Sequence, residues 1–155
     1  MFFYSNTSEI EIPNNCFVVN LDLIDDFNLF LKQCYIKLKF PDYFGFNINA
    51  LYDCFCDFSW IQEEVIIIIH STVKQMKYDD LKMYVEMLYD EEQERKGYKP
   101  LNKFEIDEKF KQLKKSYEFL SYDDFLNWIK PPQEKRYYFM EEDRGLIESI
   151  LSSSM

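Results

Sequence analysis

The residues between Phe40 and Val73 combine carboxylates with aromatic side chains, and no lysine or arginine occurs among them. Aromatic anchors beside carboxylates are typical of a surface that binds a basic protein tightly. A solvated acidic face next to a core strand is the simpler alternative, but the aromatic side chains are too many for the core side of one short helix. The carboxylates and aromatic residues of this window include Asp42, Asp53, Asp57, Glu63, Glu64, Tyr43, Phe44, Phe46, Tyr52, Phe58 and Trp60.

The overall charge points in the same direction. The formal net charge is −10, which disfavours nucleic acid as a partner because affinity for phosphates comes from lysine and arginine. Such a charge favours a basic partner, although plain solubility is the commoner reason for it.

Catalytic chemistry has few candidates. The chain has one histidine, His70, and four cysteines, Cys16, Cys34, Cys54 and Cys56, without the spacing of a zinc site. The three glycines lie too far apart for a phosphate-binding loop. We therefore expect no enzyme, no cofactor and no metal. An enzyme that uses His70 and a cysteine is retained as a hypothesis, and it requires one thiol with a lowered pKa.

The compartment is predicted from what the sequence lacks. The N-terminal residues have no charged segment followed by a long apolar one. The longest aliphatic run, Val65–Ile69, is too short to span a bilayer. We expect a cytoplasmic protein with reduced thiols and no membrane contact, acting as a monomer.

Two short apolar runs predict buried strands with helices between them. The runs are Cys16–Asn20 and Glu64–His70. Apolar residues recur three and four positions apart over Ile24–Leu38, which predicts an amphipathic helix. A second helix is expected at about Asn47–Asp57, with Asn47 as its N-cap. This alternation predicts a parallel sheet.

The rest of the chain is predicted to be mostly helical and highly charged. Apolar stripes at Leu81–Leu88 and Ile106–Leu120 predict helices, and a short helix should end at Trp128. The residues RYYFME, Arg136–Glu141, are predicted to form a last strand. The alternation at Glu9–Ile12 suggests an additional edge strand.

The second helix and the loop before it resemble a known family. Residues 40–45 read FPDYFG, Asn47 follows, and residues 50–54 read ALYDC. This order resembles the barstar family of intracellular ribonuclease inhibitors, over about residues 16–90 and the last strand. The resemblance implies an α/β fold with a three-stranded parallel sheet packed by helices. It also implies a long helical insert before the last strand, where the family usually has one helix.

The resemblance also implies a binding surface. In barstar-like proteins the second helix and the loop before it plug the active site of a small basic ribonuclease, where a carboxylate takes the place of an RNA phosphate. By this resemblance Asp53 matches the principal inhibitory carboxylate, and Tyr43 and Gly45 match contact residues of the loop. The expected partner-binding residues are Tyr43, Phe44, Gly45, Phe46, Asn47, Asn49, Ala50, Tyr52, Asp53 and Asp57.

Three positions depart from the family pattern. Asn49 stands where the family usually has a second acidic residue, Tyr52 replaces a tryptophan, and Phe46 stands where one member has a glutamate. An asparagine can still accept hydrogen bonds, but it cannot mimic the charge of a phosphate.

The sequence therefore predicts one barstar-like domain over residues 1–155, with its core at about 16–90 and 134–143 and a helical insert at about 91–130. We expect an immunity protein, or antitoxin, that blocks the active site of a basic ribonuclease or nuclease toxin. The alternative is a barstar-fold adaptor or regulatory module whose partner is not a nuclease.

Overall fold

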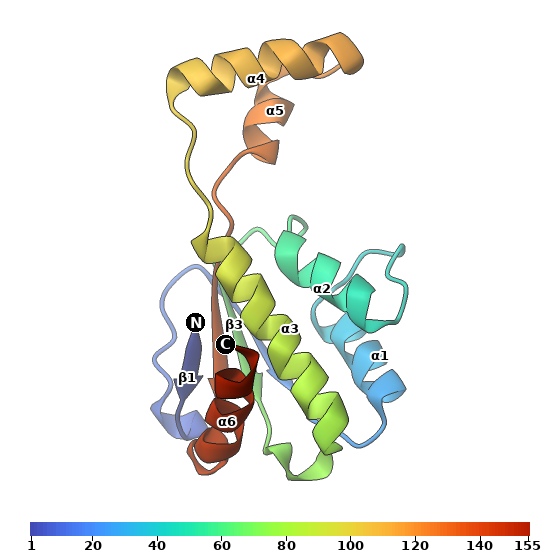
Figure 1. Cartoon of the computed structure of the whole chain (residues 1–155), viewed down its shortest axis with the longest axis vertical. Coiled ribbons are helices and arrows are strands. Elements are labelled where there is room, and N and C mark those ends of the chain that lie inside the picture. The colour runs from blue at the N-terminus through green and yellow to red at the C-terminus, as the bar shows by residue number, and fades with distance from the viewer. The chain divides into compact units, whose positions relative to one another are not determined.

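A computed structural model describes the backbone of residues 1–155 and every side chain except that of Thr7. The chain forms two compact units (Figure 1). The sheet unit comprises Met1–Arg95 and Gln133–Met155, and the helical unit comprises Lys96–Pro132. That the whole chain acts as a single barstar-like domain stays a prediction.

The sheet unit contains a parallel sheet of four strands in the order β1-β4-β3-β2. Its strands are β1 (Phe2–Tyr4), β2 (Cys16–Leu21), β3 (Val65–His70) and β4 (Glu134–Phe139). The parallel sheet is confirmed, whereas the expectation of three strands is wrong because β1 pairs with the free edge of β4.

The additional strand is not the one that alternation predicted. Thr7–Glu9 form a short 3-10 turn, and residues 10–12 belong to no strand. Phe2 instead lies beside the β4 rings of Tyr137 and Phe139, with ring centroids 5.5 and 6.0 Å apart. Aromatic packing of this kind stabilises an edge strand more than the alternating glutamates and isoleucines of residues 9–12 would. The strand β4 also starts two residues earlier than expected and ends at Phe139.

Helices cover one face of this sheet (Figure 1). They are α1 (Phe27–Lys37), α2 (Ile48–Asp57), α3 (Tyr78–Lys96) and α6 (Arg144–Ser154). Ile66 and Ile68 of β3 belong to the main core with these helices, while Ile67 and Ile69 join a smaller cluster. β3 is thus buried on both faces, as the isoleucine run predicted, and one of these faces shares the main core with α2.

The helical unit consists of α4 (Lys103–Ser116) and α5 (Tyr122–Trp128). Asn102 and Glu105 form a reciprocal capping box at the start of α4. The helix ends at Ser116, so the predicted stripe to Leu120 continues beyond it into the loop. Leu120 and Phe125 are the buried apolar side chains of this unit among the residues described.

Candidate functional site

The loop before α2 is shaped by the cap of that helix. Asn47 accepts a hydrogen bond from the Ala50 backbone N–H at 2.9 Å, which confirms it as the N-cap. Its side-chain amide donates to the Gly45 carbonyl oxygen at 3.1 Å. A side chain at Gly45 would crowd this amide, since a Cβ there would lie 3.2 Å from Asn47 Nδ2. Phe46 takes the left-handed conformation, with φ of 50°.

This loop sends its aromatic side chains in different directions. Phe44 is buried, and its ring lies 4.8 Å from the ring of Phe40 between centroids. Phe44 was expected to contact a partner, but the structure places it in the core. Tyr43 is 73% exposed and Phe46 is 43% exposed. Ala50 is half-buried on the first turn of α2.

The exposed side of α2 carries polar and acidic side chains. Asn49, Asp53 and Asp57 are spaced four residues apart and all exposed, so they lie along one side of the helix. Partial desolvation raises the pKa of the Tyr43 hydroxyl, and the carboxylates of Asp57 and Asp53 raise it further. We call the exposed residues Tyr43, Phe46, Asn49, Asp53 and Asp57 the acidic face.

Tyr52 connects α2 to α3 rather than pointing freely to solvent. Its hydroxyl donates a hydrogen bond to the Glu94 carboxylate, and this bond raises the pKa of Tyr52. The Cys56 thiol lies 3.8 Å from the same carboxylate oxygen. Glu94 is exposed and contacts Tyr52 and Cys56 of α2. No sequence pattern distinguishes it from the other charged residues of α3. The structure therefore places a carboxylate of α3 against Tyr52 and Cys56 of α2.

A buried ionic cluster lies under the end of α2. The Lys135 ammonium donates to the Phe55 carbonyl oxygen and, at 2.8 Å, to a Glu91 carboxylate oxygen. The Tyr137 hydroxyl donates to the other Glu91 oxygen, and Arg95 Nε donates to the first at 3.2 Å. Lys135 and Glu91 side chains are each 1% exposed.

This cluster anchors α2 at its C-terminal end. The Phe55 carbonyl belongs to the last turn of α2, where carbonyl groups have no partner within the helix. Lys135 supplies the missing donor and also lies 5.5 Å from the centroid of the Phe58 ring. Burial lowers the pKa of Lys135, and Glu91 opposes that change. Sequence patterns missed this lysine because lysine is almost never fully buried.

His70 has a structural environment. Its Nδ1 lies 2.8 Å from the Tyr138 carbonyl oxygen and therefore donates, while Nε2 accepts from the Tyr84 hydroxyl at 2.9 Å. Burial lowers the pKa of His70 to about 4. Burial also raises the pKa of Cys54 and of Cys56 to about 11. These environments count against a reactive cysteine–histidine pair, which requires a lowered thiol pKa.

Among the described side chains, no group of three or more His, Cys, Asp or Glu is placed to hold a metal ion. None of the described helices combines the length and the apolar character that a bilayer crossing requires.

A comparison with protein families identifies the chain. The family model described as Barstar (barnase inhibitor) matches residues 14–106, which is more than half of the chain and includes the whole acidic face. The protein belongs to the barstar family. Neither curated proteins nor solved structures gave a significant match.

Proposed function

We propose that this protein inhibits a basic ribonuclease by inserting the acidic face into the active site of the nuclease. The observation that carries the proposal is the exposed Asp53 on a capped helix, in a window without lysine or arginine from residue 40 to residue 73. Its carboxylate has no neighbouring cation on α2 to neutralise it. It is therefore free to meet the cationic groups that bind an RNA phosphate.

The aromatic members of the acidic face supply apolar contact area. Tyr43 and Phe46 are both exposed, and Phe46 packs against Tyr35 with ring centroids 5.2 Å apart. Ile36, on the exposed side of α1, is 72% exposed. Rigid aromatic groups around a desolvated charge are the usual composition of an interface centre.

Glu94 offsets the missing charge at Asn49. Tyr52 holds the Glu94 carboxylate beside α2, and Tyr52 is the chain neighbour of Asp53. We propose that Glu94 serves as the second anionic contact of this surface. The inhibitor then reaches the nuclease with carboxylates from two helices, α2 and α3.

Inhibition of RNA cleavage tests the proposal. The purified chain is titrated into barnase and into any ribonuclease encoded beside its own gene, with a fluorogenic RNA substrate. We expect stoichiometric inhibition of at least one of these enzymes, and competition with the substrate, because the proposed site is the active site itself. Absence of inhibition, or inhibition that leaves substrate binding unchanged, would refute the proposal.

A further inference from the structure

The helical unit leaves half of its large apolar side chains exposed. A unit of this size cannot build a large core of its own, and here Leu120 and Phe125 are its buried apolar residues among those described. Phe119 is 98% exposed, so folding buries almost none of its side chain. The exposed large apolar side chains of this unit are Tyr98, Phe104, Tyr117, Phe119, Tyr122, Leu126 and Trp128. Clustered exposure of this kind marks an interaction site.

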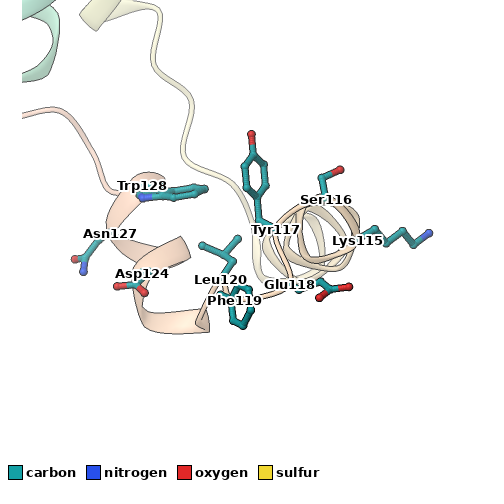
Figure 2. A pocket seen from close by; sticks show the side chains of 9 residues that line it. All are labelled: Lys115, Ser116, Tyr117, Glu118, Phe119, Leu120, Asp124, Asn127 and Trp128. Carbon is teal, nitrogen blue, oxygen red and sulfur yellow. The ribbon is translucent and has the colours of Figure 1, made fainter.

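Part of this surface forms a pocket between the end of α4, the following loop and α5 (Figure 2). Its volume is about 660 Å³, within the range that holds a side chain or a small ligand. Tyr117 and Trp128 stand nearly perpendicular to each other, with ring centroids 6.1 Å apart. We call this the aromatic pocket, and its lining residues are Lys115, Ser116, Tyr117, Glu118, Phe119, Leu120, Asp124, Asn127 and Trp128.

The charge of the helical unit is opposite to that of the rest of the chain. Residues 96–132 hold eight lysines and six carboxylates, whereas the remaining residues hold ten basic and twenty-two acidic side chains. Residues 109–117 contain four lysines and no carboxylate. Lys115 lines the aromatic pocket and has no ion pair with a described residue. The cationic end of α4 therefore borders an apolar pocket.

We propose that the aromatic pocket binds an acidic segment of a partner protein, which inserts an apolar side chain between Phe119 and Trp128 and places its carboxylates beside the lysines of α4. This inference is independent of ribonuclease inhibition. A basic nuclease is complementary in charge to the acidic face. It is not complementary to the aromatic pocket, which lies beside the cationic end of α4.

RNA fits the aromatic pocket less well than an acidic protein segment does. The carboxylates of Glu118 and Asp124 line the pocket and would repel phosphates there, as they would any carboxylate placed inside it. Asp124 is already engaged, because it accepts a hydrogen bond from the Ser121 hydroxyl at 2.7 Å. A peptide can direct its own carboxylates away from the pocket to the lysines, while an oligonucleotide carries a phosphate at every step.

The test is a selection from a random peptide library against the full-length chain, followed by fluorescence anisotropy with synthetic copies of the selected peptides. We expect enrichment of peptides that carry negative charge and a large apolar residue. Their affinity should fall at least about tenfold in the variant Phe119→Ser/Trp128→Ser. Phe104→Ser is the matched control, since Phe104 is 74% exposed but lies outside the aromatic pocket. It should bind like the parent chain.

Several results would overturn the proposal. One is a selection without enrichment, or with enrichment of basic peptides; another is binding that survives Phe119→Ser/Trp128→Ser. Tighter binding of a labelled uridine oligonucleotide than of any selected peptide would assign the pocket to RNA instead. Self-association in sedimentation experiments that the same double variant abolishes would assign it to a second copy of the chain. Circular dichroism confirms that the variants, whose replaced side chains are exposed, remain folded.

Discussion

Removal of the Lys135 ammonium should loosen α2 and destabilise the sheet unit. In the variant Lys135→Met the Phe55 carbonyl loses its donor, and Glu91 loses its nearest cation, 2.8 Å away. Methionine has a side chain of similar length, and the site is buried, since the Lys135 side chain is 1% exposed. The change is therefore one of charge and hydrogen bonding far more than of volume.

The magnitude follows from the remaining contacts. Leaving one partner of a buried ion pair unpaired generally costs about 3–5 kcal/mol. Glu91 still keeps Arg95 Nε at 3.2 Å and the Tyr137 hydroxyl, so we expect the lower end, a loss of about 3 kcal/mol in the free energy of unfolding. Adding Glu91→Gln removes the buried negative charge, so the double variant should lose about 1–2 kcal/mol less than the sum of the single variants.

Urea denaturation followed by circular dichroism measures these free energies. The control is Lys74→Met, which breaks an exposed ion pair with Glu142 at 3.5 Å and should cost less than about 1 kcal/mol. A loss in Lys135→Met no larger than in the control, or strict additivity with Glu91→Gln, would refute the view that this cluster anchors α2.

Three further predictions concern α2 and the core. Asn47→Ala removes the N-cap of α2 and should lower the free energy of unfolding by about 1 kcal/mol in urea denaturation, while an unchanged value would contradict the role of the cap. Burial lowers the pKa of His70 to about 4, so the unfolded chain binds a proton that the folded chain refuses between about pH 6.5 and 4. His70 therefore costs no stability above about pH 6.5, and the free energy of unfolding should fall by about 2 kcal/mol from pH 7 to pH 5. The same loss in His70→Gln would contradict this assignment. Asn49→Asp adds a carboxylate to the acidic face and should strengthen binding to the inhibited ribonuclease a few-fold at low salt, less at high salt; weaker binding would show that Asn49 does not face a cationic site.

The sequence predicted those elements whose local pattern agrees with their environment. The isoleucine run of β3 is buried on both faces, and Asn47 caps α2 as its residue type and position suggested. In both cases the residues that form the pattern also make the stabilising interactions. The prediction therefore needs no knowledge of which distant residues they contact.

The missed features depend on contacts between distant residues. β1 is only three residues long and pairs with β4, more than a hundred positions away. Lys135 is buried because Glu91, on α3, and the end of α2 supply acceptors. Phe44 points inward because it packs against Phe40, which belongs to the same core. A pattern read along the chain contains none of this information.

The affinity contributed by Asp53 tests the central claim most directly. The dissociation constant is measured for the parent chain, Asp53→Ala and Asp25→Ala against the ribonuclease that the parent chain inhibits. Asp25 is an exposed carboxylate before α1, outside the acidic face. We expect Asp53→Ala to weaken binding at least about 30-fold and Asp25→Ala less than about threefold. Equal affinities for the parent chain and Asp53→Ala would contradict the proposal that α2 presents a carboxylate to the active site.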